Sequence, residues 1–406
     1  MFRRTLHWLP LCCAPILGCS YYDASLLDPL AGPTDATSDS YVDAADASSE
    51  SSGEASDDAT DDTSDVAPDS VAEGSAEAQT CGHARPPDPP TVSGAGGDIE
   101  FVVAVSAIDF GDATGSPKQI GYDLDFRCTC QGEANGCIRQ SWATADACDG
   151  PEGRDNSTGA FISKMSTLFG GFGSESWSEA ALAGEWSLLL QVSGYNGLPD
   201  DDQVRLDWFV PDQYWEDKPD KTFVPSWDGT DTWPIRASCL VDQGAGSLSL
   251  NAPKYFDDHA YVSGGVIVGS MSESAFQVSA DYAIQFNGAF ITAKVVEGPM
   301  GWALQEGLLA ARWKLDNILG QISRISLLGM PVCTDHLAYL SLKKQICDYA
   351  DIYSGVGSPT TPCDSISTGM IFETAPARFG DIFVDVLSPA VCDPAVDPAN
   401  DTCNNL

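Results

Sequence analysis

The stretch that decides the fold is residues 298–328, GPMGWALQEGLLAARWKLDNILGQISRISLL. Its apolar side chains recur at spacings of four and three residues, which fits one long amphipathic helix. Gly307 interrupts that pattern, however, and the opening Gly-Pro-Met-Gly is typical of a hairpin turn. We therefore predict a strand over about 302–313 that returns against 290–296, and then a helix over about 316–328. The single long helix is the alternative.

Working outward, runs rich in β-branched and aromatic residues predict further strands. These runs are 99–111, 121–126, 186–197, 203–212, 235–240, 247–250, 260–271, 276–283, 290–296, 365–373 and 382–386. Shorter helices are predicted at 159–169 and 336–349, the second with Lys343 and Lys344 facing outward. The expected fold is mainly β: an antiparallel β-sandwich of jelly-roll or laminin-G-like kind, with two or three packed helices.

Residues 1–18 have the composition of a secretion signal. Arg3 and Arg4 form a basic start, and Leu6–Gly18 is an apolar core that is too short for a membrane span. The core ends in Ile16-Leu17-Gly18-Cys19, which resembles the lipobox of a bacterial lipoprotein. This resemblance implies cleavage before Cys19 and a diacylglycerol on its sulfur, and hence a lipid-anchored protein of the cell envelope, at the outer membrane. An ordinary secretion signal cut nearby is the alternative.

Residues 19–90 are predicted to form a disordered acidic tether. Between Ser20 and Thr80 the chain has sixteen Asp and Glu side chains and no Lys or Arg. Such a segment buries too little apolar area to offset its chain entropy, and its like charges repel one another. The folded region is expected over 91–406, either as one domain or as two halves near 91–240 and 241–406.

The charge of the chain limits the class of partner. The formal net charge is −39 at pH 7. Nucleic-acid binding needs Lys and Arg against phosphate, so this acidity argues against it. The same acidity suits cation binding and solubility outside the cell.

Three segments of the folded region carry a second resemblance. They are GYDLDFRCTC at 121–130, VSGYNGLPDDDQV at 192–204 and CDSISTGMIFETAPARFG at 363–380. They are similar to parts of uncharacterised, secreted, acidic lipoproteins of myxobacterial type. The resemblance covers most of the folded region and implies no activity.

Eleven cysteines follow Cys19, at positions 81, 128, 130, 137, 148, 239, 333, 347, 363, 392 and 403. In an exported chain they are expected to form disulfides, and their odd number leaves one free thiol. We expect bridges within Cys128–Cys148 and among Cys333, Cys347 and Cys363. The loop spacing C-x-C-x₆-C-x₁₀-C lacks the paired C-x₂-C of a structural zinc site, so zinc is not expected there.

The loop at 121–156, GYDLDFRCTCQGEANGCIRQSWATADACDGPEGRDN, is the candidate cation site. Oxygen-bearing side chains gather at its two ends: Asp123, Asp125, Asp149, Asp155 and Asn156. The first two lie two residues apart, so their carboxylates face one side of a strand, and a local disulfide would bring both ends together. Calcium takes six to eight oxygen ligands, which this set could supply with help from Asp200–Asp202. The alternative is a group of solvated surface acids.

A second candidate site is the irregular, aromatic stretch that follows residue 207. Its aromatic side chains are Trp208, Tyr214, Trp215, Trp227 and Trp233. Flat rings beside Asp and Asn are typical of surfaces that bind glycans. The alternative is that these rings fill the core beneath a long loop.

No motif for catalysis occurs in the chain. The patterns H-E-x-x-H, G-x-S-x-G, G-x-x-x-x-G-K and G-x-G-x-x-G are absent. Two of the many carboxylates could serve glycoside hydrolysis, but no feature singles out a pair. The sequence therefore favours a non-catalytic binding or structural protein of the envelope, with calcium as the cofactor and a glycan or an envelope protein as the partner. A carbohydrate-binding or polysaccharide-active surface protein is the alternative.

Overall fold

The structure, a computed structural model, describes residues 81–92, 94, 96–217, 223–279, 282–327, 329–355, 359–384 and 391–406. The predicted signal peptide, Cys19 and the predicted tether up to Thr80 lie outside the described residues. Residues 80–406 fall in one compact unit. Strands from both predicted halves, 91–240 and 241–406, belong to the same sheet, so the two halves share one fold.

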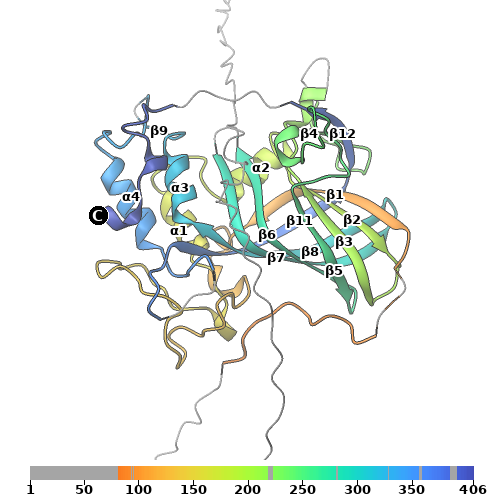
Figure 1. Ribbon diagram of the computed structural model, residues 1–406, viewed down its shortest axis with the longest axis horizontal. Helices are drawn as coiled ribbons and strands as arrows, with labels where there is room; N and C mark the ends of the chain where they lie inside the picture. Colours follow the sequence, from red (N-terminus) through yellow and green to blue (C-terminus); the bar gives the residue numbers. More distant parts are fainter. Residues whose placement is uncertain are drawn as a thin grey trace, which may run out of the picture. The chain divides into compact units, whose positions relative to one another are not determined.

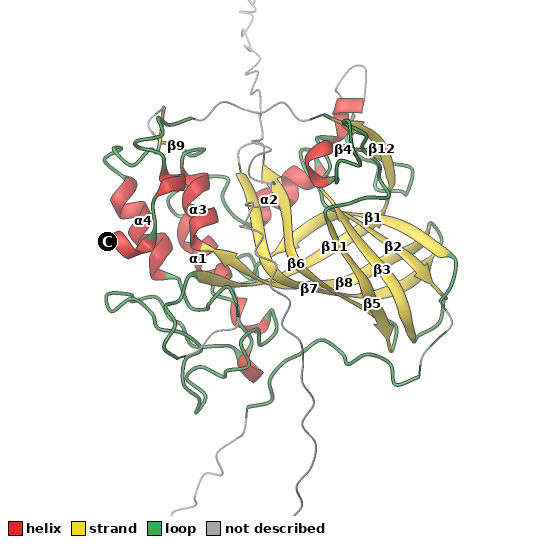
Figure 2. Ribbon diagram, viewed as in Figure 1, coloured by secondary structure: helices red, strands yellow, loops and turns green. Residues whose placement is uncertain are grey.

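Eight antiparallel strands form a closed barrel (Figures 1 and 2). Around the barrel the order is β1-β11-β8-β7-β6-β5-β3-β2, and β2 pairs with β1 to close it. The strands are β1 Ile99–Asp109, β2 Leu189–Tyr195, β3 Asp201–Phe209, β5 Tyr255–Ser263, β6 Val266–Ser279, β7 Tyr282–Gly298, β8 Gly301–Lys314 and β11 Ser365–Pro376. The predicted mainly β, antiparallel fold with packed helices is confirmed. The structure adds that its strands make one closed sheet in place of the two sheets of a sandwich.

The hairpin of β7 and β8 settles the choice posed by residues 298–328. Gly298 pairs with Gly301, which leaves Pro299 and Met300 as a two-residue turn. Gly301 has a φ of +103°, a conformation that favours glycine. The strand predicted over 302–313 is confirmed, and the helix predicted after it is α3, Leu315–Ile322, which ends earlier than expected.

The core is built around large aromatic side chains from several strands. Phe276 contacts Trp186, Trp208 and Phe286, with ring centroids 5.8, 6.1 and 5.6 Å apart. Phe286 in turn contacts Trp313 of β8 at 6.3 Å. The indole N–H of Trp208 donates to the Ala275 carbonyl at 2.7 Å, so its polar atom is satisfied although the ring is buried. The core therefore ties β3, β6, β7 and β8 together.

Four helices pack outside the sheet (Figure 2): α1 Thr158–Ser166, α2 Ser174–Leu182, α3 and α4 Tyr339–Asp348. The helices predicted at 159–169 and 336–349 are confirmed as α1 and α4, whereas α2 was not predicted. The Ser178 hydroxyl of α2 accepts a hydrogen bond from the Ile108 amide of β1, which seats α2 on the barrel. Among the described residues, no helix is long and apolar enough to span a membrane.

Two short sheets complete the fold. β4, Thr232–Arg236, pairs in parallel with β12, Arg378–Phe383, and β9, Ser326–Leu327, pairs with β10, Met330–Pro331. The strands predicted at 121–126 and 247–250 are wrong. Residues 121–126 are held by side-chain and backbone contacts within the loop, and Phe126 has a φ of +56°, which ends any extended run.

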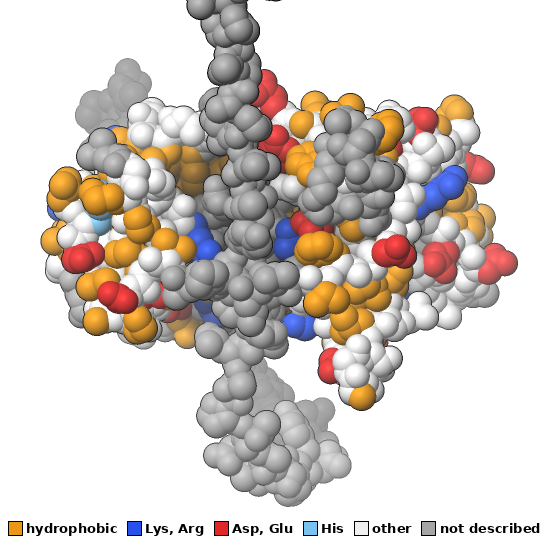
Figure 3. Space-filling model, turned by 90° about the horizontal axis from the view of Figure 1, so that it is seen from above, with side chains coloured by type: hydrophobic (Ala, Val, Ile, Leu, Met, Phe, Trp, Pro, Cys, Tyr) orange, Lys and Arg blue, Asp and Glu red, His pale blue; other side chains and the backbone are white. Residues whose placement is uncertain are grey.

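The α4 helix corrects the orientation of one predicted lysine. Lys344 is exposed, as predicted, but Lys343 is only 1% exposed, and its Nζ lies 2.8 Å from Asp401 Oδ2. The Tyr339 hydroxyl donates to the same carboxylate oxygen at 2.8 Å. The last residues of the chain therefore dock on α4. Leu337, just before α4, and Leu340 within it are exposed. Figure 3 shows one face of the molecule, on which apolar side chains are spread among polar and acidic ones.

Five disulfides tie the loops to one another: Cys81–Cys128, Cys130–Cys148, Cys137–Cys363, Cys333–Cys392 and Cys347–Cys403. Cys239 is the free thiol, so the predicted single free cysteine is confirmed. The predicted local bridge is confirmed by Cys130–Cys148. The bridges predicted among Cys333, Cys347 and Cys363 are wrong, because each of these residues pairs with a distant segment.

The folded unit includes residues that were assigned to the tether. The Ala84 amide donates to the Glu152 carbonyl at 2.7 Å, and the Ala84 carbonyl accepts from the Asp123 amide at 2.8 Å. The Tyr261 hydroxyl donates to the Pro87 carbonyl. Residues 81–90 therefore belong to the fold, and its boundary lies near Cys81 rather than residue 91.

Candidate metal site

The two ends of the 121–156 loop meet in space. Carboxylate oxygens of Asp123, Asp125 and Asp155 lie within 4.8 Å of one another. Asp123 and Asp155 are each only 4% exposed, and Asp125 is partly buried. Three of the five side chains proposed from the sequence therefore form one compact group of oxygens.

Local hydrogen bonds explain this convergence. The Asp155 amide donates to the Tyr122 carbonyl at 3.0 Å, and the Leu124 amide donates to Asp155 Oδ2 at 2.7 Å. The Arg127 amide donates to one oxygen of Asp123 and one of Asp125, at 3.1 and 3.0 Å. The start of the loop is thus folded around the carboxylates, and its end is pinned beside it.

Asp149 lies near the group and interacts with it electrostatically. Burial, partly opposed by a hydrogen bond from the Thr129 amide, raises the pKa of Asp149 to about 8, and the charges of Asp351, Asp125 and Asp123 contribute. Burial and the neighbouring Asp123 likewise raise the pKa of Asp125 to about 6. The pKa of Asp155 is raised well above its ordinary value, mainly by burial. Each of these pKa values is raised because the carboxylates are shielded from water and lie close together.

Asn156 does not join this group. Its side-chain amide donates to the Phe110 and Pro117 carbonyls at 3.0 Å each, and its oxygen accepts from the Gly159 amide at the start of α1. All of these contacts anchor α1 to the end of β1. Asn156 therefore has a structural role, in place of the predicted role as a ligand.

Asp351 is a fifth carboxylate that sequence reasoning missed. Together with burial, its charge raises the pKa of Asp125, Asp149 and Asp155, although it lies about 200 residues after the 121–156 loop in the sequence. The Ser157 hydroxyl and the Ser367 amide donate to it, so its oxygens are already bonded. The Cys137–Cys363 disulfide fastens the loop to the segment that precedes β11, on the same part of the chain as Ser367. No local pattern in the sequence marks Asp351.

Two basic side chains face the carboxylates. His83 Nδ1 lies 2.5 Å from Asp123 Oδ2. Arg312 of β8 donates to the Leu124 carbonyl, and the charges of Asp155 and Asp125 act on its pKa, which burial lowers. Arg139 is a third basic group, whose charge acts on Asp351. The five carboxyl groups outnumber these basic groups.

Several carboxylate oxygens remain available. Among the described residues, one oxygen each of Asp125, Asp149 and Asp155 accepts a backbone amide, and no hydrogen bond reaches the other. The available oxygens could take a cation, which prefers carboxylate ligands at this density. Oxygens of this kind are the ligands that hard divalent cations take.

The predicted aromatic site has a different character. Trp208 and Trp233 are fully buried, and Tyr214 is 7% exposed with its hydroxyl donating to Asp231. These three rings offer no exposed face to a glycan. Trp227 packs against Trp233 with centroids 5.7 Å apart, and only Trp215 and Trp227 keep part of their surface accessible. Most of the proposed surface is core, because the rings fill the space beneath the loop.

Compared with known proteins, the chain matches no protein-family model, no curated protein and no solved structure.

Proposed function

We propose that this chain is a lipid-anchored cell-envelope protein of non-catalytic, binding or structural type, and that its 121–156 loop binds calcium. The observation that carries the calcium proposal is the group of carboxylate oxygens of Asp123, Asp125 and Asp155 within 4.8 Å of one another. The envelope location rests on the resemblance of Ile16–Cys19 to a lipobox.

The balance of charge supports a cation at this position. Asp123, Asp125 and Asp155, with Asp149 beside them, are too close to be ionised together without a compensating charge. The alternatives open to such a group are to hold protons or to bind a cation. Calcium suits this geometry because it accepts mono- or bidentate carboxylates and an irregular shell of oxygens.

The role that fits this cation is structural. The loop contains little regular secondary structure. Cys130–Cys148 closes it, and Cys81–Cys128 and Cys137–Cys363 tie it to other segments. A calcium ion would join the start of the loop to its end. It would also hold Asp123 in place, and Asp123 contacts His83 and Ala84. The loop would then present a fixed surface to an envelope partner.

Thermal unfolding of the whole chain tests this proposal. Calcium in excess is expected to raise the unfolding temperature, and a chelator is expected to lower it. Ligand at about 100 times its dissociation constant adds about 2.7 kcal/mol to stability. The double variant Asp125→Asn with Asp149→Asn should remove the response. The variant Asp335→Asn, at an exposed carboxylate elsewhere, should retain it.

The comparison with magnesium sharpens the test. Magnesium demands near-ideal octahedral geometry and gives up its water reluctantly, so it should stabilise the chain less than calcium. An unfolding temperature that calcium and chelator leave unchanged would rule out the calcium site. Equal responses in the wild type and the Asp125/Asp149 double variant would place any bound calcium elsewhere.

A further inference from the structure

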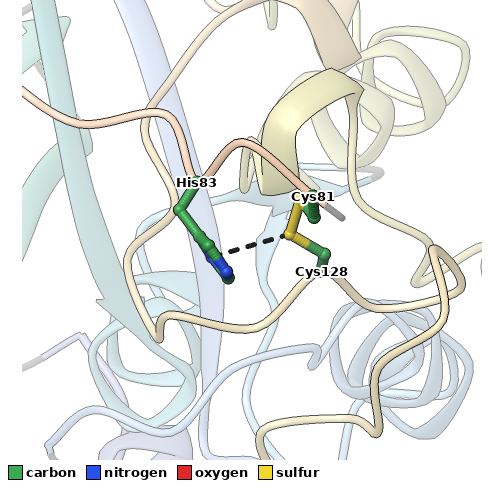
Figure 4. A group of neighbouring side chains, drawn as sticks. All are labelled: Cys81, His83 and Cys128. Atoms are coloured by element: carbon green, nitrogen blue, oxygen red, sulfur yellow. Dashed lines mark hydrogen bonds between the residues drawn. A yellow bond between two sulfur atoms is a disulfide. The ribbon is translucent and has the colours of Figure 1, made fainter. Parts of the chain in front are cut away.

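Cys81, His83 and Cys128 form a second group of side chains of the types that bind metals (Figure 4). The sulfur atoms of Cys81 and Cys128 and a ring nitrogen of His83 lie within 4.8 Å of one another. His83 Nδ1 is 3.6 Å from Cys128 Sγ and 2.5 Å from Asp123 Oδ2. The two sulfur atoms are joined as a disulfide, which blocks their use as ligands.

One separation in this group is already that of a tetrahedral zinc site, whereas the bonded sulfur atoms of Cys81 and Cys128, and the His83 and Asp123 atoms 2.5 Å apart, would have to move apart. With Zn–S distances of about 2.3 Å and Zn–N distances of about 2.0 Å, neighbouring ligand atoms lie about 3.3–3.8 Å apart. The distance between His83 Nδ1 and Cys128 Sγ falls in this range. A methyl group at Gly153 would lie 2.8 Å from Cys128 Sγ and 2.9 Å from Asp123 Oδ2, so these two atoms converge on the same small space. Cys81, Cys128, His83 and Asp123 therefore provide four ligands of the right kind.

A carboxylate behind the histidine completes this arrangement. His83 Nε2 lies 3.5 Å from Glu133 Oε1, and the other oxygen of Glu133 accepts the Cys128 amide at 3.2 Å. Histidines that bind metals commonly donate their second ring N–H to a carboxylate, which fixes the orientation of the ring. Glu133 is positioned for this role and is itself held by the cysteine backbone.

The backbone conformation at His83 also supports a functional role for this group. His83 has a φ of +50°, in the left-handed region that non-glycine residues seldom adopt. Such strain concentrates at functional sites and is offset by surrounding contacts. Here the conformation directs the imidazole toward the Cys81–Cys128 bond, with 30% of the side chain exposed. The group is therefore reached from solvent through His83 and Cys81, while Cys128 and Asp123 lie buried behind them.

We propose that reduction of the Cys81–Cys128 disulfide creates a zinc site formed by Cys81, Cys128, His83 and Asp123. A dithiol reductant passes two electrons and two protons to the disulfide and closes into its own disulfide, which leaves two thiols. Zinc then displaces the two thiol protons to solvent and is held by two thiolates, the imidazole and one carboxylate oxygen. The metal replaces the covalent link between residues 81–90 and the loop. This site does not depend on the proposed calcium function.

Cobalt(II) is the probe for this site, because thiolate ligands give it an intense charge-transfer absorption. The whole chain is reduced with a dithiol, and the dithiol is removed under anaerobic conditions because its own thiolates would bind cobalt. The chain is then titrated with cobalt, and zinc is added in competition. We expect one cobalt per chain, displaced by zinc, and no such absorption before reduction. His83→Ala should lose the tight site, and Glu133→Gln should weaken it about 10–100-fold. The variant Cys130→Ser with Cys148→Ser, which removes the neighbouring disulfide, should retain it.

Cysteine alkylation provides a readout that does not rely on a variant folding. Zinc is expected to slow the alkylation of Cys81 and Cys128 in the reduced chain, but not that of Cys130 and Cys148. Uniform protection of all cysteines, or equal cobalt spectra with and without His83, would show binding by loose thiols and overturn the proposal. The absence of a cobalt–thiolate band would do the same. The Asp125/Asp149 double variant should retain zinc binding while losing the calcium response, so the two proposals can fail separately.

Discussion

Asp125 and Asp149 are single side chains through which the stability of the fold should depend on pH. Both pKa values are raised from the ordinary 3.8, to about 6 and about 8, chiefly by burial. The folded chain without calcium therefore binds more protons than the unfolded chain between about pH 4 and pH 8. Since stability falls with pH wherever the folded state binds more protons, the calcium-free chain should be less stable at pH 8 than at pH 5.

Urea unfolding with a chelator, repeated at several pH values, measures this effect. The urea midpoint should fall as the pH rises from 5 to 8, and calcium should reduce the fall by replacing the protons. Asp149→Asn should flatten the upper part of the curve, because the amide carries no proton to lose. A midpoint that rises over this range in the calcium-free chain would contradict the assignment.

The candidate site was predictable only where its residues are close in sequence. Asp123, Asp125 and Asp155 could be proposed because one loop carries them and its cysteines suggest closure. Asp351 could not, since its position depends on how the segment before β11 returns to the loop. Asn156 was a plausible ligand by composition, but the need to anchor α1 uses all of its polar atoms.

At the scale of the element, Gly307 explains why β8 has the spacing of a helix and the structure of a strand. Gly307 pairs with Phe372 of β11, and a Cβ at this position would lie 2.3 Å from the Phe372 ring. A glycine interior to a helix would cost about 1 kcal/mol, whereas here it makes room for an aromatic ring. The interruption in the apolar pattern was therefore the informative feature.

Gly307→Ala should destabilise the fold by about 1–3 kcal/mol, because the Phe372 ring must move to admit a methyl group. Gly320→Ala in α3 is the matched control. A Cβ at Gly320 would meet its first neighbour at 3.7 Å, an ordinary contact, so helix propensity should stabilise the chain by about 0.5–1 kcal/mol. Urea denaturation of both variants measures whether each substitution lowers or raises the unfolding free energy. Equal effects would show that the contact with Phe372 does not limit the strand.

Most helices and strands could be predicted from the sequence, but the conformation of the loops could not. The β7–β8 turn, β8 and α4 follow from local patterns of turn residues and apolar spacing. The 121–126 segment was predicted as a strand from its residue types. Its Asp123 and Leu124 amides instead donate to the Ala84 carbonyl and the Asp155 carboxylate, partners that no periodicity reveals.

For the molecule as a whole, the Cys137–Cys363 bridge is the contact of longest range among the disulfides. It joins residues separated by 226 positions, whereas Cys130–Cys148 spans 18. A disulfide that closes a longer loop removes more conformational entropy from the unfolded chain and therefore stabilises the fold more. This stabilisation grows only with the logarithm of the loop length. Disulfide connectivity could not be predicted from the sequence, because each long bridge joins segments that only the complete fold brings together.

Replacing both members of Cys137–Cys363 by Ser should lower the unfolding free energy by about 2–5 kcal/mol. Replacing Cys130 and Cys148 should cost less, because that loop is shorter. Denaturant midpoints of the two double variants provide the comparison. A larger loss from the shorter bridge would indicate that local strain or contacts, rather than chain entropy, control disulfide stabilisation here.

The Cys81–Cys128 bridge also determines how a mechanical load enters the protein. The first described residue is itself bonded to the loop, so tension applied to the chain before Cys81 passes through a covalent bond into residues near Cys128. The hydrogen bonds of Ala84 and Pro87 then lie beyond the loaded bond and are shielded from the pull. Opening the disulfide would transfer the tension to these weaker contacts and peel the strap of residues 81–90 away from the barrel.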